Sequence, residues 1–200
     1  MSTQGVPVES NARSFDLIVV GGSAGAVEIL GLMALHLTPR LIPAVAIVVH
    51  MAQDARAMLH ELLSGVGRPQ MKLAEDKEPI VPGTVYFAVP GYHLLVEAER
   101  TFALSVDEPV HFSRPSIDVL FESAAEAYGE RVAGIILSGA NADGAAGLRA
   151  IGSAGGGALV QSPESAAAPT MPEAALSACP GARALDIQSL LQWLDALNAK

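Results

Sequence analysis

Residues 15–30 read FDLIVVGGSAGAVEIL, and this stretch decides the fold. Its aliphatic run LIVV is rich in β-branched side chains, which is typical of a strand buried on both faces of a parallel sheet. After two glycines, residues 24–37 place apolar side chains at three- and four-residue spacing, which predicts a helix. A strand that enters a helix through a glycine turn leaves Ser23 at the carboxyl edge of the sheet, beside the positive end of the helix.

Gly21, Ser23 and Gly25 match the pattern G-x-S-x-G, in which a sharp turn exposes a nucleophilic serine. Alone this signal is weak, because a serine in a glycine-rich turn also serves as an ordinary helix cap. A hydrolase interpretation therefore depends on finding partners for Ser23 elsewhere in the chain.

Composition limits the classes of function that are open. The chain has 200 residues, of which 50% are hydrophobic, and this is enough for one α/β domain with a full core. Its formal net charge is -9. Nucleic acid is an unexpected partner for so acidic a chain, since phosphates need clustered Lys and Arg. The single cysteine, Cys179, excludes an internal disulfide and indicates a reducing compartment. With neither a secretory signal nor a long apolar segment, we expect a cytoplasmic protein that is not embedded in a membrane.

The rest of the chain repeats the strand-to-helix pattern. We expect a three-layer, doubly wound α/β fold with a mostly parallel sheet, and an antiparallel hairpin or meander appended near residues 84–106. Residues 1–13 are expected to be a disordered leader, and residues 14–200 one domain. Further strands are predicted at residues 44–49, 132–137 and 158–161, and further helices at residues 54–64, 119–128, 171–176 and 187–197.

Three polar residues share one predicted position. Ser23, His50 and Asp143 each follow the carboxyl end of an apolar strand, which is the edge where open parallel sheets bind ligands. A serine becomes a nucleophile when an imidazole takes its proton, and a carboxylate holds that imidazole in the correct tautomer. Each residue alone has an ordinary structural explanation, but their coincidence favours a serine hydrolase. His93 follows a P-G-Y turn and His111 lies in the loop before Arg114; either could line the same cleft, although ordinary loop chemistry is the stronger explanation for each. No residues show metal-ligand spacing.

Several longer blocks carry a family resemblance. They are IVVGGSAGAVEIL, VVHM, AEDKEPIVPGTVYFAVPGYHLLVE, RPSIDVLFESAAEAYGERVAGIILSGANADGAAGLRAI and QSPESAAAPTMPEAAL, in this order. Together they resemble the catalytic domain of the chemotaxis receptor protein-glutamate methylesterases of the CheB type. The resemblance extends from about residue 15 to the C-terminus.

This resemblance implies a reaction and a set of roles. Ser23 falls on the nucleophile of the family, His50 on its histidine and Asp143 on its aspartate. The backbone amide of Ala140 falls at the oxyanion position, and we assign the amide of Ala24 to the same role. The implied reaction is hydrolysis of γ-glutamyl methyl esters on helical receptor cytoplasmic domains with release of methanol, and some members also deamidate glutamine. No cofactor is implied, and the implied partners are methylated receptor helices and chemosensory proteins.

The sequence also departs from the family. Ala24 and Ala26 replace a usual threonine and glycine in the elbow, and Ala140 stands where methionine is common, so substrate fit is expected to differ. We expect a stand-alone catalytic domain without a phosphoacceptor receiver domain, and hence an open cleft that phosphorylation does not gate in cis. Two alternatives remain: a phosphate-binding turn, although GGSAGA is not G-x-G-x-x-G, and a catalytically weak or silent docking protein.

Overall fold

The main sheet is built around the strand that precedes Ser23. A computed structural model of the protein describes residues 14–37, 43–50 and 70–198. Within these ranges the sheet has the strand order β3-β4-β2-β1-β7-β8-β9, and every neighbouring pair is parallel. The strands are β1 (Leu17–Gly22), β2 (Ala44–Val49), β3 (Gln70–Leu73), β4 (Thr84–Phe87), β7 (Val132–Ile136), β8 (Gly157–Gln161) and β9 (Arg183–Leu185). The direction of strand progression reverses between β1 and β7, which marks the edge where ligands bind in such sheets.

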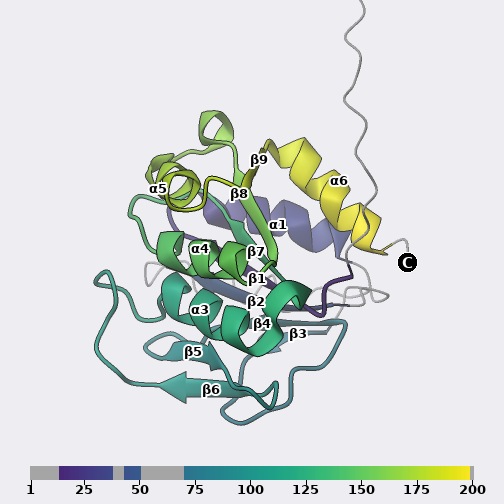
Figure 1. The fold of residues 1–200 in the computed structure, drawn as a ribbon, viewed down its shortest axis with the longest axis vertical. Coiled ribbons are helices and arrows are strands. Elements are labelled where there is room, and N and C mark those ends of the chain that lie inside the picture. Colours follow the sequence, from purple (N-terminus) through teal and green to yellow (C-terminus); the bar gives the residue numbers. More distant parts are fainter. Residues whose placement is uncertain (1–13, 38–42, 51–69, 199–200) are drawn as a thin grey trace, which may run out of the picture.

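Helices cover both faces of this sheet and give it three layers (Figure 1). The first face carries α3, α4, α5 and the antiparallel hairpin β5-β6, while α1 and α6 pack against each other on the second. The doubly wound fold with an added hairpin is therefore confirmed. The elements are α1 (Ala26–His36), β5 (His93–Val96), β6 (Phe102–Ser105), α3 (Ile117–Tyr128), α4 (Ala145–Ser153), α5 (Thr170–Ala178) and α6 (Ile187–Asn198).

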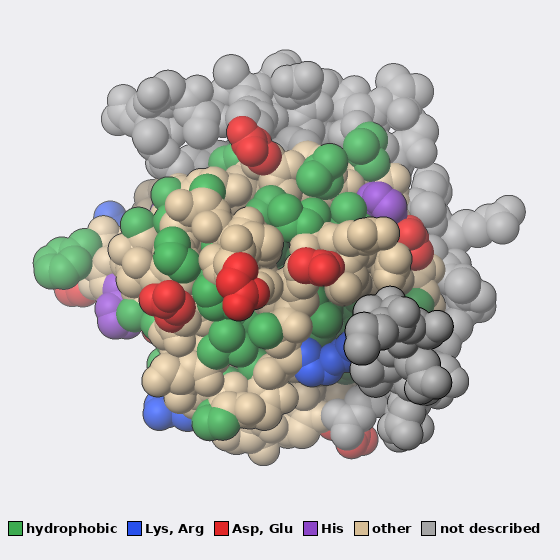
Figure 2. Space-filling view, turned by 90° about the horizontal axis from the view of Figure 1, so that it is seen from above, with side chains coloured by type: hydrophobic (Ala, Val, Ile, Leu, Met, Phe, Trp, Pro, Cys, Tyr) green, Lys and Arg blue, Asp and Glu red, His purple; other side chains and the backbone are tan. Residues whose placement is uncertain are grey.

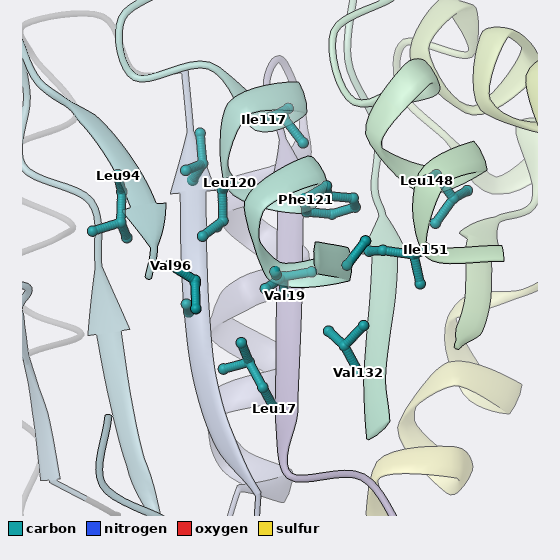
Figure 3. Packing of buried hydrophobic residues seen from close by; sticks show 14 of the residues in the cluster. Leu17, Val19, Leu94, Val96, Ile117, Leu120, Phe121, Val132, Leu148 and Ile151 are labelled. Carbon is teal, nitrogen blue, oxygen red and sulfur yellow. The ribbon is translucent and has the colours of Figure 1, made fainter. Parts of the chain in front are cut away.

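Strand β1 supplies side chains to both hydrophobic layers, because successive residues of a strand point to opposite faces. Leu17 and Val19 belong to the layer under α3 and α4, whereas Ile18 and Val20 belong to the layer under α1 and α6, and all four are fully buried. Figure 3 shows the first layer, in which side chains of β1, β5, α3, β7 and α4 converge. Burial on both faces explains why the LIVV run shows no polar alternation.

One prediction about the middle of the chain needs correction. Residues 85–88 were expected in the antiparallel meander, but Thr84–Phe87 lies in the parallel sheet between β2 and β3. All four residues of β4 are buried. Packing on both faces of the strand therefore determines that β4 joins the parallel sheet, and the nearby turns do not. The antiparallel part is limited to β5 and β6. The predicted helix at residues 54–64 and the leader at residues 1–13 lie outside the described residues.

The charged side chains on the surface are distributed as the acidic composition leads us to expect. On the face shown in Figure 2, acidic side chains are scattered among hydrophobic ones, and the basic side chains of the described residues form no continuous patch. Among the helices of the described ranges, none is both long and apolar enough to cross a membrane.

Candidate active site

The turn between β1 and α1, here called the elbow, is sharp and closely packed. Gly25 has a φ of 80°, in the left-handed region, and a Cβ there would lie 2.6 Å from the Cβ of Ala167 and 2.9 Å from Oγ of Ser138. The amide of Ser23 donates to the carbonyl of Ser138 at 2.9 Å, and the carbonyl of Ser23 accepts the amide of Ala26 at 3.0 Å. Ser23 is partly exposed between a buried strand and a buried helix face. Only glycine suits such a crowded, left-handed position, so the motif predicted the turn correctly.

His50 follows β2 and lies beside this elbow. Its amide donates to the carbonyl of Gly22 at 3.0 Å, which continues the parallel register of β1 and β2 past their ends. Its Nε2 lies 2.8 Å from Oδ2 of Asp143, an ion-pair distance, although the carboxylate lies off the direction of a well-aligned hydrogen bond. Its Nδ1 lies 3.5 Å from Oγ of Ser113. The structure thus brings together the predicted histidine and aspartate.

Asp143 is fully buried, and its carboxylate lies at the N-terminus of α3. It accepts hydrogen bonds from the hydroxyl of Ser116 at 2.8 Å, the amide of Ile117 at 2.7 Å and the amide of Asp118 at 3.0 Å. Burial by itself raises the pKa of this carboxyl, but the contact with His50 and the three hydrogen bonds outweigh it. The pKa of Asp143 therefore lies below its ordinary value, and the group is a carboxylate at neutral pH.

A carboxylate at Nε2 favours the imidazole tautomer that carries its proton there and leaves the lone pair on Nδ1. Ser23 and His50 form no hydrogen bond with each other, both being among the described residues. Nucleophile–base bonds are often long before substrate binds and tighten in the reactive complex. The contact from Ser23 to His50 thus remains a prediction, whereas the contact from His50 to Asp143 is present.

The two residues assigned to the oxyanion hole lie on neighbouring loops. Ala24 is in the elbow, and Ala140 is in the loop after β7; both are exposed. Ser138 begins the second loop and binds the elbow, so the two segments are in direct contact. This proximity is compatible with a shared anion site, and the roles of both amides remain predictions.

A cleft of about 250 Å³ opens at the carboxyl edge of the sheet, next to His50. The ends of β2 and β4 form one wall, and the loop before α3 forms the other; Ser23 and Asp143 lie outside the lining. The lining residues are Val49, His50, Ala88, Pro90, Phe112, Ser113, Arg114 and Pro115. Within the described ranges, no group of three or more His, Cys, Asp or Glu side chains is placed to hold a metal ion.

His93 and His111, the two other histidines considered for the cleft, have structural partners. His93 is buried, accepts the amide of Ser116 at Nδ1 (3.1 Å) and lies 3.1 Å from the carbonyl of Glu108 through Nε2. His111 lies 3.4 Å from the carboxylate of Asp118. Neither histidine lines the cleft, so the expectation that they could do so is not supported.

Sequence reasoning missed two buried polar groups near the site. Asp118 accepts the amide of Gly147 at 2.7 Å; burial raises its pKa, and the neighbouring charge of Asp143 raises it further. Ser138 is fully buried against the elbow. A signal for Ser138 was present, since it follows an aliphatic strand run just as Ser23 and His50 do.

The fold and site define a class: an α/β protein whose sheet edge carries the parts of a serine hydrolase. The chain belongs to the CheB methylesterase family, because the family model of that description matches residues 18–194.

Individual relatives agree with this assignment. The chain is 42% identical over 165 residues to a "Putative protein-glutamate methylesterase/protein-glutamine glutaminase" of Leptospira interrogans, covering 82% of this chain and 86% of that protein. It is 36% identical over 164 residues to the "Protein-glutamate methylesterase/protein-glutamine glutaminase" of Nitrosomonas europaea, covering 80% of this chain and 46% of that one. The chain therefore spans about half the length of the second relative.

The crystal structure of the Thermotoga maritima CheB methylesterase catalytic domain has the same fold. Its TM-score is 0.81 at 24% sequence identity, and the match covers 92% of this chain and 100% of that one. At this level of identity the comparison supports the architecture, while the family assignment comes from the sequence matches.

Proposed function

We propose that the protein is a serine hydrolase that removes methyl esters from glutamyl side chains of chemoreceptor-like signalling proteins and releases methanol. The observation that carries the proposal is the contact of His50 Nε2 with the buried carboxylate of Asp143, beside the elbow that presents Ser23. Membership of the methylesterase family and the names of the relatives support it over a silent docking protein or a phosphate-binding turn.

The geometry supports an acyl-transfer mechanism. The hydroxyl of Ser23 attacks the ester carbonyl while Nδ1 of His50 takes its proton, and the ionised Asp143 stabilises the imidazolium through Nε2. The amides of Ala24 and Ala140 stabilise the negative oxygen of the tetrahedral intermediate. The imidazolium returns the proton to the methoxy oxygen, and methanol leaves a glutamyl ester on Ser23. Water, activated by the same nitrogen, then hydrolyses this ester and restores the serine.

The same steps account for the second activity in the names of the relatives. In a glutamine side chain the leaving group is ammonia rather than methanol, and the acyl-enzyme that forms on Ser23 is identical. We therefore expect glutamine deamidation at the same site, more slowly because an amide is a less reactive acyl donor than an ester.

Phe112 supports a protein rather than a small ester as substrate. It is 103% exposed at the rim of the cleft that contains His50. Its loop is braced: Arg114 donates to the carbonyls of Val106 at 2.7 Å and Asp107 at 2.9 Å. An exposed aromatic side chain on a braced loop is suited to contact an apolar stripe of a substrate helix.

The proposal is tested by methanol release from receptor cytoplasmic fragments that carry labelled methyl esters. We expect release with the wild type, its loss by about 10³-fold or more in Ser23→Ala, and no change in Ser177→Ala, which removes an exposed hydroxyl on α5. A folded wild type that releases no methanol and whose Ser23 is not labelled by a fluorophosphonate would contradict the proposal and favour the docking role. Labelling without release would indicate a serine hydrolase with another ester as substrate.

A second measurement tests the substrate class. Phe112→Ala should raise KM for the receptor fragment by about tenfold, since it removes an interfacial aromatic contact worth about 1–2 kcal/mol. Leu35→Ala, which removes an exposed apolar side chain on α1, is the matched control and should leave KM unchanged. Equal effects of both substitutions would argue against contact between Phe112 and the substrate.

A further inference from the structure

The side chain of Ser138 lies in the centre of a buried polar network behind the elbow. Its Oγ donates to the carbonyl of Ala24 at 2.6 Å and accepts the amide of Ala168 at 2.9 Å. Its own amide donates to Oε1 of Gln161 at 2.8 Å, and Nε2 of Gln161 donates to the carbonyl of Ser165 at 3.0 Å. The side chains of Ser138 and Gln161 are both fully buried, and the bond between the two residues lies away from water.

This network holds the elbow at two adjacent points. The main-chain carbonyl of Ser138 accepts the amide of Ser23, which fixes the peptide that precedes Ser23. The hydroxyl of Ser138 binds the carbonyl of Ala24, which fixes the peptide that follows Ala24. One residue thus sets the orientation of both peptides that flank the Ser23–Ala24 peptide, whose amide is assigned to the oxyanion hole.

The same residue begins the loop that carries the other assigned amide. Two residues further along the chain is Ala140, and the intervening Gly139 is held by its amide on the carbonyl of Ala168 at 3.0 Å and by its carbonyl on the amide of Met171 at 2.9 Å. A Cβ on Gly139 would lie 2.5 Å from Cε of Met171, so this segment has little freedom to move. The separation of the Ala24 and Ala140 amides therefore depends on the bond from Ser138 to the elbow.

We infer that Ser138 is a positioning residue for the ester hydrolysis: its hydroxyl, supported by Gln161, fixes the elbow relative to the loop of Ala140 and so sets the width of the oxyanion hole. The inference rests on the proposed function. Oxyanion contacts strengthen in the transition state, and small displacements of reacting groups cost up to about 10²-fold in rate. Loss of the hydroxyl should thus lower kcat and leave KM largely unchanged.

The test compares Ser138→Ala with Ser138→Thr, using methanol release from methylated receptor fragments. We expect kcat of Ser138→Ala to fall about 10- to 100-fold with KM within about threefold of the wild type. Ser138→Thr keeps the hydroxyl and should recover kcat to within about threefold of the wild type. The matched control is Ser123→Ala, because the hydroxyl of Ser123 also joins two backbone segments, donating to the carbonyl of Val119 in α3 and accepting the amide of Val96 in β5, neither of which belongs to the elbow.

The outcomes separate this inference from the proposed function. If the wild type releases methanol and folded Ser138→Ala keeps kcat within twofold, the positioning role is wrong while the hydrolase assignment stands. Equal loss of kcat in Ser138→Ala and Ser123→Ala would reduce Ser138 to a structural residue. Should Ser138→Ala fail to fold, Ser138→Cys takes its place, because a thiol fills the same space but is a weak hydrogen-bonding group, and the same fall in kcat is expected.

Discussion

The carboxylate of Asp143 binds the first turn of α3 and contacts His50 at the same time. A negative charge is favoured at a helix N-terminus, and Ser116, which precedes the helix, has no side-chain cap of its own there. The charge of Asp143 therefore serves the stability of α3 as well as the site.

Replacement of Asp143 by Asn should damage both roles. We expect kcat to fall by about 10³- to 10⁴-fold, because an amide does not select the correct imidazole tautomer, and the free energy of unfolding to fall by about 2–4 kcal/mol. Urea denaturation and methanol release measure the two effects. The control is Asp186→Asn, at the exposed start of α6, where Asp186 accepts the amide of Ser189. Asn can cap the helix there too, so kcat should not change and the free energy of unfolding should fall by less than about 1 kcal/mol.

We expect opposite dependences of stability on pH from the two buried carboxyls at the start of α3, those of Asp143 and Asp118. The pKa of Asp143 is lowered from 3.8, so its contribution to folding is present above that value and is lost as pH falls through the folded pKa. The pKa of Asp118 is raised from 3.8, so its ionised form opposes folding at neutral pH, and this cost disappears on acidification through the raised value.

Urea denaturation as a function of pH tests this difference. The destabilisation caused by Asp143→Asn should shrink as pH falls below about 4, where the carboxyl of the unfolded wild type becomes protonated, and should vanish below the lowered pKa of the folded protein. Asp118→Asn keeps an acceptor for the amide of Gly147 and should leave the free energy of unfolding at neutral pH unchanged or raise it, with any gain lost in acid. A neutral-pH destabilisation by Asp118→Asn equal to that of Asp143→Asn would show that Asp118 is favoured in its charged form.

At the scale of the element, the strand-to-helix turn depends on one glycine far more than on another nearby. Gly25 is left-handed and crowded by Ala167 and Ser138, whereas Gly31 lies inside α1 with no atom within 4 Å of the position of a Cβ. The two positions thus form a matched pair within one βα unit.

Alanine at these positions should have effects of opposite sign. Gly25→Ala introduces backbone strain and a steric clash, so we expect a loss of about 1–3 kcal/mol in the free energy of unfolding and a large fall in kcat. Gly31→Ala should raise the free energy of unfolding by about 0.5–1 kcal/mol and leave kcat unchanged. Thermal denaturation with parallel activity assays distinguishes them, and a neutral Gly25→Ala would contradict the geometry assigned to the elbow.

Elements with a strong local pattern were predictable from sequence, and those defined by distant partners were not. The aliphatic runs of β1, β2 and β7 carry their own signal, because each is buried on both faces. Strand β3 at the edge is partly exposed, and β9 has three residues, so neither shows a periodic pattern. The parallel position of β4 is set by contacts with β2 and β3, which no local pattern specifies.

The candidate site shows the same division. The positions of Ser23, His50 and Asp143 could be predicted from the rule that ligands bind at the carboxyl ends of parallel strands. The hydrogen bonds that Asp143 receives from α3, and those that Ser138 makes to the elbow, could not be predicted, because they join segments that are distant in the chain.

For the whole molecule, the two faces of the sheet each carry a buried hydrophobic layer, and the layer that contains α3 supports Asp143. Leu190 of α6 is fully buried in the layer opposite the hairpin, while Ile117 is fully buried in the layer of α3 and its amide binds Asp143. Replacing either side chain by alanine leaves an apolar cavity, but only the cavity at Ile117 adjoins the site.

Leu190→Ala and Ile117→Ala should therefore both cost about 2–5 kcal/mol in the free energy of unfolding. Below the melting temperature of each variant, Leu190→Ala should keep kcat within twofold of the wild type, whereas Ile117→Ala should lower it because the support of Asp143 and of the elbow is lost. Denaturation and initial-rate measurements on the same samples test this. Equal falls in kcat would show that the site responds to global stability rather than to its local support.

The strand order has a consequence for the protein during its synthesis on the ribosome. Strand β1, which leads to Ser23, pairs on one side with β2 and on the other with β7. In the chain, β7 and Asp143 come after the hairpin and α3, so they are synthesised later. A chain still emerging from the ribosome holds the serine and the histidine without their carboxylate, and one edge of its central strand lacks a partner. The nascent chain should thus be inert as an esterase, and products of interrupted translation that end before β7 should be substrates for chaperones and proteases.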